Sequence, residues 1–309
     1  MKAVLFVLAV VAACKADPSP DGPDAAGGDD AGVIDARDNT GWTPLIARHW
    51  QLAPGATNTY KCTRIQVTQD MWVAGFRADS PRGTHHQVLT ISTTSTATGD
   101  YDCSAGTLDN QMLYAAGVGT DDFTFPDGVA MHVPAGTYLN LNLHLFNASD
   151  NPIGDSSSGV LVKLVDHAAV VHEADMMFSG TSLIFVNNDS QPHTAQGGCT
   201  APVDWHVFGL WPHMHQTATH QTWSYTPPAT GTPIKLIDDA FIFEEQKNYP
   251  IADTVIHAGD AILTTCTYVN SGKNPIFFGD GSDKEMCFTG MYKYPAGGGL
   301  FQCTTGPHL

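Results

Sequence analysis

The amino-acid sequence predicts an all-β protein with two tandem antiparallel β-sandwich domains. Apolar and polar residues alternate with a period of two at several places, as expected for strands with one buried face. The apolar spacing of three and four residues that marks amphipathic helices is almost absent. Clusters of Gly, Pro, Asp and Asn separate the alternating segments. The length of 309 residues fits two domains or one large β domain, and the spread of strands favours two.

The clearest predicted strand covers residues 138–145. Its four leucines share one face because side chains alternate along a strand, and the other face carries Asn140, Asn142 and His144. The two domains are predicted at residues 41–168 and 169–309, with the join near 166–175. Further strands are predicted at residues 64–67, 87–92, 159–165, 182–186, 205–210, 237–244 and 261–269.

The N-terminus has the features of a secretory signal. Lys2 precedes an apolar run at residues 3–13 that is too short to span a bilayer as a mature helix. The run ends in V-A-A-C, which is typical of the lipobox of bacterial lipoproteins, where the cysteine, here Cys14, is acylated. An ordinary signal peptide cleaved nearby, with Cys14 incidental, is the alternative. We expect an exported protein, periplasmic or at the cell surface, anchored by lipid to the bacterial outer membrane.

Residues 14–40 are predicted to form the lipobox cysteine and a disordered tether. From residue 15 to 39 the segment is mainly Asp, Gly, Ala and Pro, with little to bury. Seven Asp against Lys15 and Arg37 give it −5 of the formal charge of −17. An acidic chain with only 14 Lys and Arg lacks the basic face that a nucleic-acid binder needs. The charge favours cations and small neutral ligands over anionic polymers.

Six further cysteines predict three disulfides, because an even number in an exported chain is typical of a disulfide framework. Thiolate metal ligands are the alternative, but the sequence has no C-x-x-C pair. The six residues are Cys62, Cys103, Cys199, Cys266, Cys287 and Cys303.

Fourteen histidines make chance motifs common, so their context decides which ones bind metal. In W-P-H-M-H-Q, residues i and i+2 of a strand point to one side, so His213 and His215 can bind one metal while Met214 turns away. Pro212 places this pair near an edge or the end of a strand.

Another histidine cluster is predicted at His85 and His86. Adjacent residues on a regular strand face opposite ways, so a shared metal requires a twist or bulge, which Gly83 permits. His144, on the polar face of its strand, is a natural third ligand from a neighbouring strand. The alternative for His144 is a hydrogen-bonded histidine with no metal.

Met286 lies directly before Cys287 in F-F-G-D-G-S-D-K-E-M-C-F. A disulfide from Cys287 to Cys266 would close a short loop and hold Met286 firmly. Buried methionines usually pack in cores. A thioether beside two imidazoles, however, selects copper over zinc or magnesium.

Short motifs in a single order extend over most of residues 58–303. One such motif is weak, but several in the same order are specific. The motifs are T-Y-K-C (59–62), T-H-H (84–86), L-Y-A (113–115), L-H with an aromatic residue two positions later (143–146), W-H-V-F (205–208), P-H-M-H (212–215), G-D-x-x-L-x-x-C (259–266) and G-x-x-x-E-M-C (281–287). With them the sequence resembles the copper type II, ascorbate-dependent monooxygenases, the family of peptidylglycine α-hydroxylating monooxygenase and dopamine β-monooxygenase.

This resemblance implies two jelly-roll-like sandwich domains that face each other across an open cleft, with two coppers per chain. One copper stores and passes electrons, and its implied ligands are His85, His86 and His144. The catalytic copper binds dioxygen, and its implied ligands are His213, His215 and Met286. Ascorbate or a similar one-electron reductant reduces both coppers, and one oxygen atom enters a substrate C–H bond.

The resemblance also implies disulfide pairs and supporting residues. Cys266–Cys287 and Cys199–Cys303 resemble bridges of the family's second domain, and Cys62–Cys103 follows by elimination. The family's usual partner of the T-Y-x-C cysteine lies where this sequence has serines at 156–158. Asn142 and His206 are predicted to orient the metal-binding imidazoles, with a purely structural hydrogen bond as the alternative for each.

The sequence departs from the peptide hydroxylases where those enzymes hold the substrate. They have an Arg two residues before the His-x-His motif, and an Asn and a Tyr two and four residues after the Met. Here Trp211, Phe288 and Gly290 take these positions, so no cation is present to bind a peptide carboxylate. We predict an apolar, aromatic wall for a small hydrophobic or aromatic substrate, made of Trp211, Phe288, Met291 and Tyr292.

The sequence therefore predicts a copper monooxygenase whose partners are dioxygen and a small-molecule substrate, with contact to a membrane only through the N-terminal lipid. The alternative is a non-enzymatic periplasmic copper-binding or copper-delivery lipoprotein. Two distinct ligand sets favour the enzyme, because a carrier does not need both. A zinc hydrolase lacks an H-E-x-x-H motif and leaves Met286 unexplained.

Overall fold

Antiparallel strand pairing produces nearly all of the regular structure, which confirms the predicted all-β class. The fold is that of a computed structural model, which describes residues 38–306 except 57, 118 and 244. Within this part of the chain the only helical segment is a 3-10 turn, η1 (His167–Ala169), and no helix has the length and apolarity to cross a membrane. Cys14, the predicted signal peptide and nearly all of the predicted tether lie outside the described residues.

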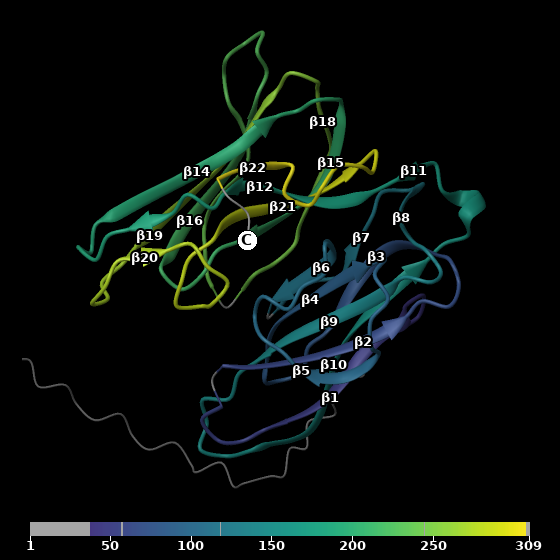
Figure 1. Ribbon diagram of the computed structural model, residues 1–309. Helices are drawn as coiled ribbons and strands as arrows, with labels where there is room; N and C mark the ends of the chain where they lie inside the picture. The colour runs from purple at the N-terminus through teal and green to yellow at the C-terminus, as the bar shows by residue number, and fades with distance from the viewer. Residues whose placement is uncertain (1–37, 57, 118, 244, 307–309) are drawn as a thin grey trace, which may run out of the picture. The chain divides into compact units, whose positions relative to one another are not determined.

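The strands up to residue 173 form two sheets, labelled in Figure 1. The first has the order β1 (Thr43–Leu52), β10 (Ile153–Leu164), β3 (Met71–Asp79), β8 (Val129–Val133) and β11 (His172–Glu173), with β7 (Phe123–Thr124) also paired to β3. The second has the order β5 (Gly99–Asp102), β2 (Thr59–Gln66), β9 (Tyr138–Leu145), β4 (Thr84–Ser92) and β6 (Gln111–Gly117).

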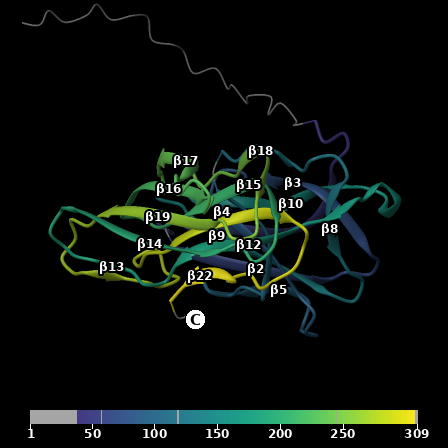
Figure 2. The ribbon, with the colours of Figure 1, turned by 90° about the horizontal axis from the view of Figure 1, so that it is seen from above.

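The strands from residue 175 onward form three more sheets. The largest has the order β18 (Tyr249–Ile256), β15 (Trp205–His213), β21 (Cys287–Tyr294), β12 (Asp175–Thr181) and β22 (Cys303–Thr305). The next has the order β14 (Pro192–Thr200), β19 (Ala261–Val269), β16 (Ala218–Thr226) and β17 (Ile234–Ala240), and Figure 2 shows β14 and β19 side by side. β13 (Phe185–Val186) pairs with β20 (Ile276–Phe277).

Both faces of β9 are buried, although its sequence alternates between apolar and polar residues. The four leucines are fully buried in the core, as the alternation predicts. Asn140, Asn142 and His144 on the other face are also buried. Residues 103–110 cover part of this face, because the side-chain amides of Asn140 and Asn142 donate hydrogen bonds to carbonyl oxygens within that segment.

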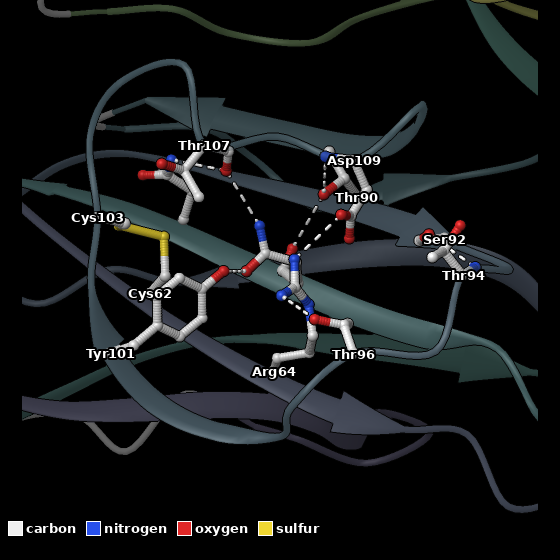
Figure 3. A network of polar contacts seen from close by, with 12 residues as sticks. Cys62, Arg64, Thr90, Ser92, Thr94, Thr96, Tyr101, Cys103, Thr107 and Asp109 are labelled. Carbon is white, nitrogen blue, oxygen red and sulfur yellow. Dashed lines mark hydrogen bonds and ion pairs between the residues drawn. A yellow bond between two sulfur atoms is a disulfide. The ribbon is translucent and has the colours of Figure 1, made fainter.

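A polar network fixes this covering segment, and Figure 3 shows it at close range. The Arg64 guanidinium donates to the Asp109 carboxylate at 3.0 Å, and the Asn140 amide donates to the Thr107 carbonyl at 3.1 Å. The Tyr101 hydroxyl in turn donates to the Asn140 side-chain oxygen at 2.7 Å. Segment 103–110 is thereby tied to two strands of the second sheet.

The three predicted disulfides are present. They join Cys62 to Cys103, Cys199 to Cys303 and Cys266 to Cys287, across sequence separations of 41, 104 and 21 residues. The Cys62–Cys103 bridge anchors the start of the covering segment to β2. The Cys266–Cys287 bridge joins β19 to β21 directly after Met286.

The two halves of the chain share one hydrophobic core. The ring of Phe123 from β7 lies 4.5 Å, between centroids, from that of Tyr292 in β21. β11 pairs with β8 of the first sheet although it follows residue 168. The predicted boundary between residues 168 and 169, and the predicted cleft, stay predictions.

The close approach of these halves requires glycine at position 209 in β15. A Cβ atom there would lie 2.4 Å from Cζ of Phe123, a distance that real side chains do not adopt. We expect Gly209→Ala to lower the free energy of unfolding by about 1–3 kcal/mol, as overpacking does. Gly154→Ala is the control, because a Cβ atom at Gly154 meets nothing within 4 Å. Equal denaturation midpoints for the two variants would contradict this account.

Candidate metal centre

The first histidine cluster forms where β4 lies beside β9. His86 and His144 are direct cross-strand neighbours, and the register shifts between Thr84 and His86, which is the irregularity that a shared site requires. Gly83, just before, has a φ of +104°, a conformation that other residues rarely adopt. One ring nitrogen from each of His85, His86 and His144 lies within 4.8 Å of the other two, and the Nδ1 atoms of His85 and His86 are 3.0 Å apart.

A hydrogen bond sets the tautomer of His144. Its Nε2 lies 3.0 Å from the side-chain oxygen of Asn58, which only accepts, so Nε2 carries the proton. Nδ1 is then a lone-pair donor, and it is buried without a hydrogen-bond partner among the described residues. The ring also stacks on Tyr60, with centroids 4.5 Å apart. An orphaned buried nitrogen beside two other imidazoles is what a metal ligand presents before the ion binds.

The second cluster lies at the end of β15. His213 is the last residue of this strand and His215 follows two residues later, with ring centroids 5.3 Å apart. Met214 between them is fully buried in a separate core cluster that includes Cys266 and Cys287. Hydrogen bonds occupy both Nδ1 atoms. His213 donates to the Gln246 side-chain oxygen at 2.8 Å and His215 to the Lys284 carbonyl at 3.1 Å, so both Nε2 atoms are left as lone-pair donors.

A buried carboxylate holds the second cluster together. Glu285 has no exposed surface, and its two oxygens accept hydrogen bonds from the main-chain nitrogens of His215 (2.8 Å) and Thr217 (2.7 Å). The Thr217 hydroxyl donates to the same carboxylate at 2.7 Å. Next to Glu285 in sequence, Met286 has its carbonyl fixed by the Tyr268 hydroxyl at 2.8 Å. Glu285 thus ties the turn that carries His215 to the segment that carries Met286.

Burial keeps the clustered imidazoles neutral. Loss of solvation lowers the pKa of His144 and of His215 to about 4 and that of His213 to about 3. Burial, with the neighbouring imidazoles of His144 and His85, lowers the pKa of His86 well below its usual value. Metal ions bind the neutral form of imidazole, so all four residues are ready to bind metal at neutral pH.

The two clusters share one cavity of about 400 Å³. His86 lines it together with His213, His215 and Met286. The remainder of its wall is mainly apolar and aromatic, and among the described lining residues none is Lys or Arg. These apolar residues include Val88, Leu108, Met112, Phe178, Trp211, Phe278, Phe288, Leu300 and Phe301.

Only two of the four residues predicted to form the apolar, aromatic wall line the shared cavity. Trp211 and Phe288 line the shared cavity, whereas Met291 and Tyr292 are fully buried in cores and are not among its lining residues.

The two residues predicted to orient imidazoles contact other groups. Asn142 donates to the Ser104 carbonyl, which supports the covering segment. His206 contacts the Asp253 carboxylate at 3.0 Å and stacks on Tyr294. Groups that do form hydrogen bonds with the clustered imidazoles include the side chains of Asn58 and Gln246 and the Lys284 carbonyl.

The donor set fits copper. Three imidazoles in one cluster, and two imidazoles sharing a cavity with a thioether in the other, are soft to intermediate ligands. The second-cluster residues that the sequence predicted lie within residues 172–305, and this segment matches the family described as copper type II ascorbate-dependent monooxygenase, C-terminal domain. The fold thus brings together two clusters of imidazoles, one of them beside a thioether, in an arrangement suited to binding metal ions. No curated protein matches the sequence.

Removing the Glu285 carboxylate should loosen the second cluster. Glu285→Ala leaves the His215 and Thr217 donors buried and unpaired, and each such donor costs about 1–3 kcal/mol, so we expect the free energy of unfolding to fall by about 2 kcal/mol or more. Urea denaturation measures the loss. Thr217→Val removes one of these hydrogen bonds and should cost about 1 kcal/mol. A loss for Glu285→Ala no larger than for Thr217→Val would show that the carboxylate is not the organising group.

The stability of the copper-free protein should fall in mild acid. Below about pH 6.5 the unfolded chain protonates its histidines, whereas folded His144 and His215 stay neutral until about pH 4. The unfolded state then binds more protons, so the free energy of unfolding decreases as pH falls through this window. His144→Asn should flatten this part of the pH profile, measured by urea denaturation. An unchanged slope in His144→Asn would contradict the assignment.

Proposed function

We propose that the protein is a copper monooxygenase that hydroxylates a substrate C–H bond with dioxygen and an ascorbate-like reductant. The family of residues 172–305 is copper- and ascorbate-dependent, which supports the class of reaction. The observation that carries the proposal is that Met286, His213 and His215 line one apolar cavity with His86 of the other cluster. A copper carrier has no need of a cavity beside its ligands.

Two coppers per chain are part of this proposal. His85, His86 and His144 would hold one, and His213, His215 and Met286 the other. Copper supplies the one-electron chemistry with dioxygen that amino-acid side chains lack. The chain's own residues orient the ligands: Asn58 and Gln246 each accept a hydrogen bond from the imidazole N–H that faces away from its cluster.

The cavity supports a small apolar or aromatic substrate. Its volume of about 400 Å³ lies in the range of small-molecule sites. Phe178, Trp211 and Phe288 give it aromatic surface that excludes water, and no lining cation is available to pair with a carboxylate. Asp109, which also lines it, is already paired with Arg64. A glycine-extended peptide, with its terminal carboxylate, does not suit this wall.

Export with a lipid anchor at Cys14 is also part of the proposal. Three disulfides support an oxidising compartment, since such bridges are rare in the cytosol. Contact with a membrane would then run through the N-terminal lipid alone.

Replacing the thioether tests the function. Met286→Leu keeps the volume but removes the sulfur, and we expect about one copper per chain instead of two and at least about a hundredfold loss of hydroxylated product per oxygen consumed. Met177→Leu is the matched control, because Met177 is buried in a core cluster of the same half. The readouts are copper titration and an oxygen electrode with product analysis over a panel of apolar and carboxylate substrates.

Three outcomes would remove the enzyme proposal. They are fewer than two coppers in the wild type, oxygen uptake that never yields hydroxylated product, and equal behaviour of Met286→Leu and Met177→Leu. If carboxylate-terminated peptides were the only substrates hydroxylated, the proposed apolar substrate class would be wrong, but the proposed type of reaction would stand.

A further inference from the structure

A second, larger hollow adjoins the first histidine cluster. It has a volume of about 1490 Å³, and both His85 and His144 line it. His86 instead lines the apolar cavity with His213 and His215. The first cluster therefore lies between two cavities, and only the smaller one is also lined by Met286. The larger hollow is free to serve a molecule other than the substrate.

Arg82 is the one cation among the described lining residues of this hollow. It is exposed, and no hydrogen bond or ion pair joins it to the described residues. Most Lys and Arg side chains of the described chain are, by contrast, paired with carboxylates. These are Arg48, Lys61, Arg64, Arg77, Lys235, Lys247, Lys284 and Lys293.

The backbone fixes the position of Arg82 close to the cluster. Arg82 precedes His85 by three residues, in a turn closed by a hydrogen bond from the Thr84 nitrogen to the Pro81 carbonyl at 3.0 Å. Gly83 in the same turn packs so closely on buried Trp50 that a Cβ atom would lie 2.7 Å from its ring. The guanidinium therefore extends from a rigid turn that leads directly into the metal-binding residues.

The rest of the hollow suits a small hydroxylated anion. Asn58 and Ser149 offer hydrogen-bonding side chains, and Phe146 offers an exposed ring 6.3 Å, between centroids, from that of His85. Asp280 and Asp283 also line the hollow, on the segment that leads to Met286. These carboxylates disfavour an anion on that side, so the charge distribution favours the side of Arg82 and His85. In a chain with a formal charge of −17, a local cation is needed to attract any anion.

We propose that this hollow is the entry site of the reductant, where Arg82 binds a monoanionic enediol such as ascorbate beside His85. The inference rests on the proposed function, which requires electrons at the first cluster. Each bound ascorbate monoanion gives one electron to a copper(II) ion, which becomes copper(I), and loses its proton to solvent, leaving the ascorbyl radical anion. A second ascorbate reduces the second copper. Reductant and substrate then occupy different cavities and do not compete.

The test compares reductants of different charge on the copper-loaded full chain. Loss of the copper(II) signal is followed by rapid-mixing spectroscopy under argon, with sodium ascorbate or with hydroquinone, which is neutral. We expect Arg82→Gln to slow reduction by ascorbate about tenfold at low salt and to leave reduction by hydroquinone unchanged. Arg82→Lys should retain most of the rate, and the difference should shrink as salt rises.

Lys273→Gln is the matched control, because Lys273 is exposed, forms no ion pair among the described residues and lines neither cavity. An equal loss with Lys273→Gln would indicate a general charge effect and overturn the proposal. So would an equal loss with hydroquinone, which would indicate damage to the cluster, or an ascorbate rate unaffected by Arg82→Gln.

A second readout does not depend on copper chemistry. Ligand-observed NMR of sodium ascorbate with the copper-free full chain should show saturation transfer that Arg82→Gln greatly reduces and Lys273→Gln does not. Absence of transfer to the wild type would overturn the site. Failure of the proposed function is recognised separately, by copper stoichiometry and missing hydroxylated product, whereas this binding measurement concerns Arg82 alone.

Discussion

One buried carboxylate determines the geometry of the second metal site. Glu285 connects two segments that are distant in sequence, because its oxygens accept hydrogen bonds from main-chain nitrogens 70 and 68 residues away. Burial raises the pKa of this carboxyl group, so its hydrogen bonds must offset an unfavourable desolvation. The carboxylate holds the main-chain nitrogens of His215 and Thr217 in place, because a buried donor or acceptor without a hydrogen bond destabilises the fold. Met286 follows Glu285 in sequence, so its backbone is held in place by the same hydrogen bonds.

A second constraint links the two clusters. The side chain of Gln246 orients His213, while its main-chain carbonyl accepts a hydrogen bond from the Gly117 nitrogen at 2.9 Å. Gly117 is the cross-strand neighbour of His86 on β6. Three residues before Gln246, the ring of Phe243 lies 4.8 Å, between centroids, from that of His85. The segment around Gln246 therefore contacts residues of both clusters.

Local sequence patterns predicted the elements, and long-range contacts completed the site. Strands 138–145 and 261–269 have their predicted bounds, because their periodicity is local. The bulge at His85 also followed from two adjacent histidines after a glycine. Alternation alone could not show that the polar face of β9 is buried, since the covering segment comes from elsewhere in the chain. Strand alternation also could not identify Asn58 or Gln246 as partners of the imidazoles. Asn58 is 86 residues from His144, and Gln246 is 33 residues from His213.

The surroundings of the histidines explain which ones suit a metal. Six other histidines lie beside carboxylates, each with 26% or more of its side chain exposed to solvent. These pairs are His49–Asp155, His132–Asp70, His193–Asp189, His206–Asp253, His220–Asp238 and His257–Asp204. The clustered histidines instead donate to neutral oxygens, such as those of Asn58 and Gln246, and face one another. A neutral acceptor fixes the tautomer without stabilising a positive charge, so the lone pair stays directed into the cluster. His144 and His213 thus differ from these six histidines in their neutral hydrogen-bond acceptors, a difference that histidine spacing alone does not reveal.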